Sequence, residues 1–418
     1  MRNFRFSFLT HFLRLTSYLS SFTHFLRLTF YYLLLIHFLL VFWAPNIYSA
    51  NITLGPYIDN LSNSQTSIVY ETDVPSPAWL GWGDWPKCDR YITPLPVKKR
   101  QRINIYGIKP GKKYCYNLYL PVTNSTYSYI ASSSTFFSFY DESISSFSFI
   151  LFSNTSYNSE DENIKFSSAV ISHFDENMLL LLNVGNMLKY STDYVKIFYG
   201  IEGVVKTKPV FNSMGPSEYG DNKEKYEGYK FIQSNYSPYR AFTRNGVVPH
   251  YYYVDVSNSR FIFLDNNNLN EIKDAPSFKK GTKQWLWLED VLKYSKDKKW
   301  IFVILNHPVY PSQSWNEEDR GSLEELLLKY RVDFVFENGS ENFLRTKKIK
   351  YGTYDENGIY YIMLGGVNVY QTYPEDEEII DSKLNIKGFL YTKINDYNID
   401  MTYYDYSLNQ LDRFVYSK

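Results

Sequence analysis

Histidine and cysteine are both scarce in this chain of 418 residues, which holds six histidines and two cysteines. Three of the histidines lie within the first 50 residues, so the rest of the chain has only His173, His250 and His307. A histidine-rich site for two metal ions needs more imidazole ligands than these. Two cysteines likewise exclude a cysteine-rich zinc cluster and a fold held together by many disulfides.

The chain also has no net charge, because 44 Lys and Arg balance 44 Asp and Glu. Residues 1–50 contain four arginines and no acidic residue, so the remainder has 40 basic and 44 acidic residues, a net charge of −4. This balance gives no reason to expect nucleic-acid binding. The length and an apolar content of 44% allow two domains with a sizeable core.

Residues 1–50 have the layout of a secretory leader, with arginines first and then the apolar run Thr29–Ala44. The run is 16 residues long, shorter than the ~20 residues that span a membrane comfortably. Pro45 and the small residue Ala50 follow it. We expect a cleaved signal peptide, with an uncleaved signal anchor as the alternative.

Residues 51–134 predict a small antiparallel β-sandwich, because short alternating segments are separated by turns such as Lys109-Pro110-Gly111. The Ser-rich stretch Ser125–Ser148 is typical of a linker, which we place at residues 135–146. Cys88 and Cys115 both fall in the β-rich region. We expect a disulfide between them if the protein is secreted, with two buried thiols as the alternative.

From residue 147 onward, apolar segments of strand length alternate with helical patterns, which predicts a layered α/β domain over residues 147–418. Four consecutive leucines, Leu179–Leu182, are typical of a strand buried on both faces. Ligands in such sheets bind beyond the carboxyl ends of the strands, so the loop Gly185–Tyr190 is the first candidate for an active site. The loop carries an amide, Asn186, where a metal-binding loop would have a carboxylate.

Several segments after residue 50 resemble, in order and spacing, the purple-acid-phosphatase branch of the calcineurin-like metallophosphoesterases. Leu54–Gly83 is similar to the family's fibronectin-III-like N-terminal domain. Segments such as GTKQWLWLEDVL and WIFVILNHPVY follow the framework of its catalytic domain. The resemblance implies an N-terminal antiparallel β-sandwich, then a layered α/β metallophosphoesterase sandwich of two mixed sheets flanked by helices, ending in C-terminal strands.

The family's metal site is read from five motifs, D-x-G, G-D-x-x-Y, G-N-H-[DE], V-x-x-H and G-H-x-H, and all five are altered here. In the first motif, Asn154 stands at the aspartate and Ser156 at the glycine. In the second, Asn186 stands at the bridging aspartate and Lys189 at the tyrosine, with Tyr190 one place further on. Both metal-binding carboxylates are therefore replaced by amides.

The third motif keeps Gly215 and Glu218 but has Pro216 and Ser217 at the asparagine and histidine. The resemblance implies that this histidine donates a proton to the leaving group. Ser217 cannot replace it, because a serine hydroxyl does not protonate an alkoxide near neutral pH.

The fourth motif has Asn306 at its histidine ligand, with His307 as the next residue. The fifth motif has no histidine in either alignment of the segment. In the two alignments the histidine positions are held by Gly339 and Glu341, or by Ser340 and Asn342.

Losing the carboxylates has a steep electrostatic consequence for a two-metal site. Two divalent ions ~3.5–4 Å apart repel by roughly 20 kcal/mol even at an effective dielectric near 20. Anionic ligands must offset that repulsion, and amides keep the shape of the ligand without its charge. We therefore expect no cofactor. The alternative is a single divalent ion held by the possible residual ligands Tyr190, Glu218, Asp265, His307 and Glu341.

Glycosylation sequons of the form N-x-[ST] begin at Asn51, Asn60, Asn124, Asn154, Asn235 and Asn338. Two of them, Asn154 and Asn338, lie on the loops where the family binds metal. A glycan on either would block the pocket and prevent phosphoester turnover there.

The favoured hypothesis is a secreted or membrane-anchored pseudophosphatase that keeps the family fold, lacks di-metal chemistry and acts in binding or structure. The first alternative is a weakly active metal-dependent phosphomonoesterase. The second is an extracellular recognition or adhesion protein that acts through its β-sandwich. Partners would be a protein, a glycan or another polar ligand, and contact with a membrane would come only from the N-terminal segment.

Overall fold

The computed structural model describes residues 50–92, 95–122, 128–141, 145–154, 159–173, 177–187, 203–219, 250–270, 275–310, 315–339, 343–365 and 378–418. All of them belong to one compact unit. The leader expected at residues 1–50 lies outside this set except for Ala50. Across the described ranges, no helix is both long and apolar enough to cross a membrane.

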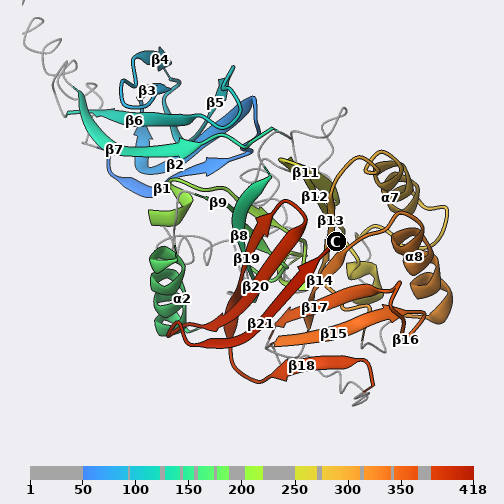
Figure 1. Ribbon diagram of the computed structural model, residues 1–418. Helices are drawn as coiled ribbons and strands as arrows, with labels where there is room; N and C mark the ends of the chain where they lie inside the picture. The colour runs from blue at the N-terminus through green and yellow to red at the C-terminus, as the bar shows by residue number, and fades with distance from the viewer. Residues whose placement is uncertain are drawn as a thin grey trace, which may run out of the picture. The chain divides into compact units, whose positions relative to one another are not determined.

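The N-terminal region consists of two antiparallel sheets, which are drawn in blue and teal in Figure 1. The three-stranded sheet has the order β1 (Ile52–Asp59), β2 (Gln65–Ser76) and β5 (Lys98–Tyr106). The four-stranded sheet has the order β4 (Arg90–Ile92), β3 (Trp79–Asp84), β6 (Lys113–Pro121) and β7 (Ser128–Phe137). Ile68 and Tyr70 on β2 and Tyr116 and Leu118 on β6 are buried. Cys88 and Cys115 form a disulfide in this region.

Strand β7 corrects the prediction that the Ser-rich stretch Ser125–Ser148 is a linker. The strand pairs with β6 in antiparallel register, from Phe137 opposite Lys113 to Ser128 opposite Pro121. It is an edge strand and is mostly half-exposed. Serines are tolerated in an exposed edge strand, so the serine content of this stretch did not indicate a strand. Within β7, Phe136 is buried.

A six-stranded mixed sheet begins the second region. Its order is β10 (Val210–Asn212), β9 (Met178–Asn183), β8 (Ser146–Phe152), β19 (Gly388–Asn395), β20 (Asn398–Asp405) and β21 (Gln410–Ser417). The first three strands are parallel, and the last three join them as an antiparallel meander. Every side chain of β9 is buried, as the four leucines predict.

The second sheet is also mixed and has eight strands. Its order is β11 (Tyr252–Val256), β12 (Ser259–Phe263), β13 (Trp300–Leu305), β14 (Phe334–Gly339), β17 (Ile359–Gly365), β15 (Phe343–Lys350) and β16 (Thr353–Tyr354), with β18 (Ile380–Leu384) paired to β15. Strands β12, β13, β14 and β17 are parallel. Their carboxyl ends therefore meet at one edge of the sheet.

The two mixed sheets pack face to face through aromatic rings. The ring of Phe149 on β8 lies 5.1 Å from that of Phe261 on β12 and 5.7 Å from that of Phe302 on β13, edge to face in both cases. Such pairs add to the free energy gained by burying the rings. This inter-sheet layer forms the centre of the main core.

Helices cover the outer faces of both sheets (Figure 1). Helix α2 (Glu160–Ser172) packs on the six-stranded sheet, with Phe166 5.0 Å from Phe152. Helices α7 (Lys283–Lys293) and α8 (Glu317–Lys329) pack on the eight-stranded sheet, where Leu288 and Leu323 are fully buried. The predicted fold class is confirmed, since a β-sandwich precedes two mixed sheets flanked by helices.

Replacing Phe149 tests the inter-sheet layer. The change Phe149→Ala removes a fully buried ring with partners on the opposite sheet. We expect it to lower the free energy of unfolding by about 3–5 kcal/mol, measured by urea denaturation. The control Ile164→Ala, at an exposed position of α2, should change it by less than about 0.5 kcal/mol. Equal effects would contradict this packing.

Candidate functional site

The altered motif residues lie beyond the carboxyl ends of parallel strands from both mixed sheets. Asn154 follows β8 and Asn186 follows β9. Asn306 follows β13, and Asn338 lies near the end of β14. All four side chains are buried, with at most 6% of their surface exposed. The fold therefore brings together loops that are far apart in the sequence, as predicted.

Three of these amides bond to one another, and we call Asn154, Asn186 and Asn338 the amide cluster. Asn154 Nδ2 donates to Asn338 Oδ1 over 2.8 Å, and Asn338 Nδ2 donates back to Asn154 Oδ1 over 2.7 Å. Asn186 Nδ2 donates to the same Asn154 Oδ1 over 2.9 Å. Asn154 thus uses its side-chain oxygen as a double acceptor within the cluster.

Backbone geometry fits amides at the first two positions of the cluster. Asn154 and Asn186 have φ angles of 56° and 57°, a left-handed conformation that asparagine adopts more readily than most residues. Gly215 packs closely against Asn186, because a Cβ added there would lie 2.5 Å from Asn186 Oδ1. That oxygen also accepts a hydrogen bond from the backbone N–H of Ser217 over 3.2 Å. The loops are therefore fitted around the amide side chains.

Glu218 stabilises the same loops through its carboxylate. It lies in the short helix α4 (Pro216–Tyr219) and is fully buried. Its Oε2 accepts backbone N–H bonds from Gly215 over 2.7 Å and from Asn186 over 3.1 Å, and its Oε1 accepts one from Met187 over 2.7 Å. Hydrogen bonds from backbone N–H groups satisfy a carboxylate well. The role that the geometry gives Glu218 is to hold the loop after β9.

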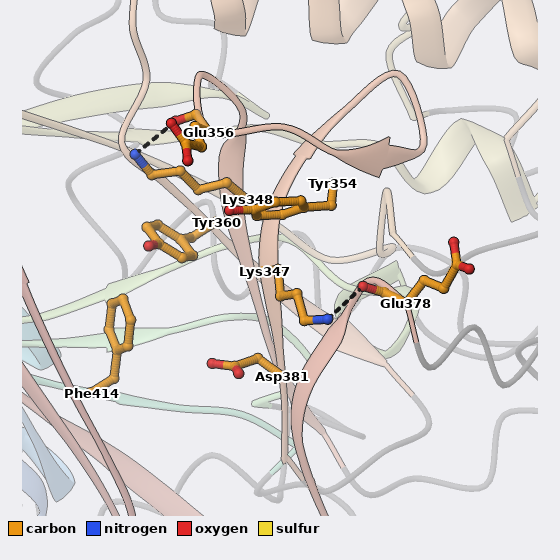
Figure 2. Close-up of a pocket in the computed structure, with 8 residues that line it drawn as sticks. All are labelled: Lys347, Lys348, Tyr354, Glu356, Tyr360, Glu378, Asp381 and Phe414. Atoms are coloured by element: carbon orange, nitrogen blue, oxygen red, sulfur yellow. Dashed lines mark hydrogen bonds between the residues drawn. The ribbon is translucent and has the colours of Figure 1, made fainter.

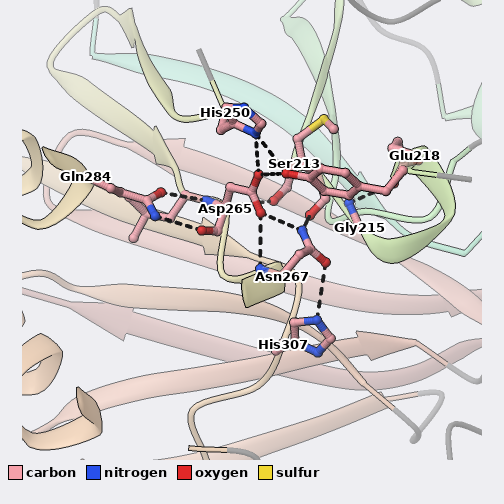
Figure 3. Close-up of polar contacts among 11 residues, drawn as sticks. Ser213, Gly215, Glu218, His250, Asp265, Asn267, Gln284 and His307 are labelled. Carbon is pink, nitrogen blue, oxygen red and sulfur yellow. Dashed lines mark hydrogen bonds and ion pairs between the residues drawn. The ribbon is translucent and has the colours of Figure 1, made fainter. Parts of the chain in front are cut away.

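Asp265 lies at the centre of a second polar network, shown in Figure 3. Its Oδ1 accepts from the backbone and side-chain nitrogens of Asn267, over 3.1 and 2.6 Å. Its Oδ2 accepts from the Tyr219 hydroxyl and lies 2.8 Å from His250 Nδ1. Gln284 bonds both the backbone N–H and the backbone C=O of Asp265. Both carboxylate oxygens therefore accept hydrogen bonds from protein groups.

His307 is buried, and the Nε2 of its imidazole is hydrogen-bonded within the protein. Its Nε2 lies 3.2 Å from Asn267 Oδ1, and an amide oxygen accepts only, so Nε2 carries the proton. Burial lowers the pKa of His307 to about 4, and the charge of Asp265 opposes this in part. The imidazole is consequently neutral near pH 7 and donates its Nε2 proton to Asn267.

The side-chain amide of Asn306 also forms a hydrogen bond within the protein. Its Nδ2 donates to the backbone oxygen of Val184 over 3.3 Å, and its backbone N–H donates to Asn266 Oδ1 over 3.2 Å. A side chain added at Gly185 would collide with the Asn306 amide. Asn306 thus fills the space between the loops that follow β9 and β13.

The donor set formed by these residues does not fit a two-metal centre. Within the parts of the chain that the structure describes, no group of three or more His, Cys, Asp or Glu side chains is placed to hold a metal ion. Neutral amides occupy the two aspartate positions, and they bond each other. Pro216 and Ser217 replace the third motif. The remaining candidate positions lie outside the described residues; they are Ser156, Lys189, Tyr190, Ser340, Glu341 and Asn342.

Two of the six sequons belong to the amide cluster. Asn154 and Asn338 are 3% and 4% exposed, and the Nδ2 of each is hydrogen-bonded. A glycan is attached at Nδ2, so the folded site has no room for one at either residue. Asn51 is exposed and Asn60 partly exposed, which suits modification. Asn124 and Asn235 lie outside the described residues.

Some residues of these networks were not selected from the sequence as site residues. Asn338 was noted only as a sequon, although it is half of the reciprocal amide pair. Asn266 and Asn267 connect the loop after β12 to His307. The only signal for them was the run of three asparagines after Asp265.

Glu337, the residue before Asn338, is a fully buried carboxyl group. Its Oε1 accepts from the backbone N–H of Val309 over 2.7 Å, while its Oε2 has no hydrogen-bond partner among the described residues. Burial raises the pKa of the Glu337 carboxyl well above its usual range, and the backbone N–H groups of Val309 and Tyr310 oppose this. In the folded state, Glu337 therefore keeps its proton to higher pH than in the unfolded chain.

The protein has two mixed sheets packed face to face, and its loops gather at the carboxyl ends of their parallel strands. This is the architecture of the calcineurin-like phosphoesterase fold. The family model described as calcineurin-like phosphoesterase matches residues 167–337. The chain therefore contains a calcineurin-like phosphoesterase domain that is similar to purple acid phosphatases, and a β-sandwich region precedes this domain.

Two curated relatives come from Arabidopsis thaliana. Purple acid phosphatase 13 is 29% identical over 139 residues, which is 31% of this chain and 24% of the relative. Probable purple acid phosphatase 20 is 31% identical over 96 residues, which is 21% of this chain and 22% of the relative. The matched segments span less than a quarter of the length of either relative.

A solved structure with a similar fold is that of purple acid phosphatase PPD1 from seeds of yellow lupin (Lupinus luteus). It superimposes with a TM-score of 0.71 over 88% of this chain and 74% of that chain, at 16% sequence identity. At this identity the likeness is one of fold. The disulfide Cys88–Cys115 and the relationship to purple acid phosphatases both point to the secretory pathway.

The buried Glu337 predicts a pH-dependent loss of stability. The unfolded chain ionises this carboxyl above a pH of about 4.5, whereas the folded chain keeps its proton to higher pH. The free energy of unfolding therefore falls as pH rises above about 4.5, by up to about 1.4 kcal/mol per pH unit. The change Glu337→Gln should remove this fall, which urea denaturation at pH 4.5, 5.5 and 6.5 measures.

The matched control is Glu325→Gln, at an exposed position of α8. It should keep the pH profile of the unmodified protein. A Glu337→Gln variant with that same profile would show that Glu337 ionises alike in the folded and unfolded states.

Proposed function

We propose that this protein is a pseudophosphatase, a member of the purple acid phosphatase-like family that acts by binding rather than by di-metal hydrolysis. The observation that carries the proposal is the pair of reciprocal hydrogen bonds between the amides of Asn154 and Asn338. Asn186 Nδ2 also donates to Asn154 Oδ1. Asn154 and Asn186 stand at the positions where the resemblance places metal-binding aspartates, and Asn338 directly precedes the fifth-motif position Gly339. In the folded state their donors and acceptors are directed at each other.

Electrostatics supports the same proposal. A pair of divalent ions would bring a charge of +4 into a buried site whose cluster is made of neutral amides. The nearby carboxylate of Glu218 accepts hydrogen bonds from three backbone N–H groups. The carboxylate of Asp265 accepts from Asn267 and Tyr219 and lies within hydrogen-bond distance of His250. Recruiting either as a metal ligand would leave buried N–H groups without acceptors, at about 1–3 kcal/mol each.

Among the described residues, neither Ser217 nor His307 is suited to donate a proton to a leaving group. Ser217 occupies the position of the family's histidine, and a serine hydroxyl is far too weak an acid for that role. His307 is neutral near pH 7 and donates to Asn267. Neither residue supplies the acid that a leaving alkoxide requires.

The location that we propose is outside the cytosol, either secreted or held at a membrane by the N-terminal segment. The disulfide Cys88–Cys115 suits an oxidising compartment. Asn51 and Asn60, in the β-sandwich region, are the described sequons accessible to glycosylation. In this setting the β-sandwich and the phosphoesterase domain serve as surfaces for a protein, glycan or other polar ligand.

Metal content and phosphatase activity test the proposal directly. Full-length protein is dialysed against trace Mg²⁺, Mn²⁺, Fe³⁺ and Zn²⁺, and bound metal is measured by elemental analysis. We expect about a tenth of an equivalent per chain or less, and no hydrolysis of p-nitrophenyl phosphate above buffer between pH 4 and 8. One or two tightly held equivalents, with activity that EDTA removes, would overturn the proposal.

Restoring a single carboxylate gives a second test. In Asn186→Asp the new side chain cannot donate to Asn154 Oδ1, and it adds a buried charge beside the loop held by Glu218. We expect a loss of about 3 kcal/mol in the free energy of unfolding, measured by urea denaturation. The exposed Asn357→Asp is the control and should change it little.

The same variant can also be titrated with Zn²⁺ and Mn²⁺. We expect neither ion to raise its melting temperature, because one carboxylate does not rebuild the donor set. A variant that binds one ion per chain and regains stability would mean that the cluster is a latent metal site.

A further inference from the structure

A groove opens on the eight-stranded sheet among residues that belong to none of the five altered motifs (Figure 2). Its volume is about 840 Å³, within the ~300–1,000 Å³ that ligand pockets usually have. Strands β15, β16, β17, β18 and β21 contribute to its lining. The groove therefore joins antiparallel strands of that sheet to the C-terminal strand of the other.

Aromatic rings from three different strands face this groove. They are Tyr354 on β16, Tyr360 on β17 and Phe414 on β21. The rings of Tyr360 and Phe414 contact each other edge to face, with centroids 4.9 Å apart. Tyr354 is 57% exposed. The guanidinium of Arg345 lies over the Phe414 ring, 4.5 Å from its centroid, so the exposed Tyr354 ring is the one that offers a flat face to a ligand.

Two lysines supply hydrogen-bond donors between these rings. Lys347 Nζ donates to the backbone oxygen of Glu378 over 2.9 Å, and Lys348 Nζ donates to that of Glu356 over 3.1 Å. Each ammonium group has three N–H bonds. Lys348 also lies over the ring of Tyr360, 5.6 Å from its centroid. The lysines are thereby fixed at the walls, close to the aromatic faces.

Carboxylates supply acceptors in the same groove. Glu356, Glu378 and Asp381 are among the residues that line it. The backbone oxygens of Glu356 and Glu378 accept from the lysines, and Asp381 is paired with Arg345. The lining residues include three carboxylates and two lysine ammonium groups. The groove therefore has no excess of positive charge that would favour a phosphate. The charged groups also make the groove unsuitable for a purely apolar ligand. A fitting ligand is uncharged, carries several hydroxyl groups and has at least one apolar face.

We propose that this groove binds a neutral oligosaccharide. A pyranose ring has an apolar face of C–H groups that stacks on an aromatic side chain, and its hydroxyl groups both donate and accept. The lysines would donate to those hydroxyls and the carboxylates would accept from them, while the exposed ring of Tyr354 provides the stacking face.

This inference deepens the proposed binding role by naming a ligand class, and it rests on that role. The two can nevertheless fail separately. A metal-loaded, active phosphatase would overturn the proposed function without involving the groove. Absence of sugar binding would overturn the inference and leave the metal result unchanged.

The test is binding of three defined trisaccharides, maltotriose, cellotriose and chitotriose, to the full protein. Saturation-transfer NMR detects binding, and titration gives the Kd. We expect at least one of them to bind, and Tyr354→Ala to weaken it about tenfold, which corresponds to about 1.4 kcal/mol. Tyr354→Phe keeps the ring and should retain most of the affinity.

The matched control is Tyr351→Ala, because Tyr351 lies in the same hairpin, is 58% exposed and does not line the groove. It should bind like the unmodified protein. The inference is overturned if none of the three sugars binds, or if Tyr354→Ala and Tyr351→Ala bind equally. It is also overturned if ATP, used as an anionic aromatic probe, binds in place of the sugars and loses affinity in Tyr354→Ala.

Discussion

The reciprocal bond between the Asn154 and Asn338 amides joins the two mixed sheets at the edge where the family has its metal site. Asn154 follows β8 of the six-stranded sheet, and Asn338 belongs to β14 of the eight-stranded sheet. A bridging metal would hold such loops together by drawing anionic ligands from both sides. Each amide offers a donor and an acceptor, so the Asn154–Asn338 pair connects the two loops through two hydrogen bonds.

Most of the buried core lies outside those loops. The core between the sheets consists of buried rings such as Phe149, Phe261 and Phe302, and a separate core lies under α7 and α8. An aspartate-to-asparagine change keeps the shape of the side chain and removes its charge. Once the charge is absent, a buried amide pair is satisfied by its own hydrogen bonds, whereas two buried carboxylates without metal would repel each other.

The sequence predicted the parts of the fold that have strong local patterns. The leucine run of β9 was correctly predicted as a strand buried on both faces, and the motif positions Asn154, Asn186 and Asn306 do meet at one edge. Strand β7 was missed because its serines suit an exposed edge. The partners within the site could not be predicted, because spacing along the chain says which loops meet but not which amide oxygen faces which nitrogen. Asn338 and the hydrogen bonds of Glu218 depend on those side-chain orientations.

The proposed groove and the altered loops use different residues of the fold. The altered loops extend from the carboxyl ends of parallel strands, where ligands of such sheets bind. The groove is lined by residues of β15, β16, β17, β18 and β21 and of the turns beside them, and none of these residues belongs to the five motifs. Tyr360 and Phe414 pack against the main core. The proposed binding role therefore rests on side chains that the core positions, and not on the amide cluster.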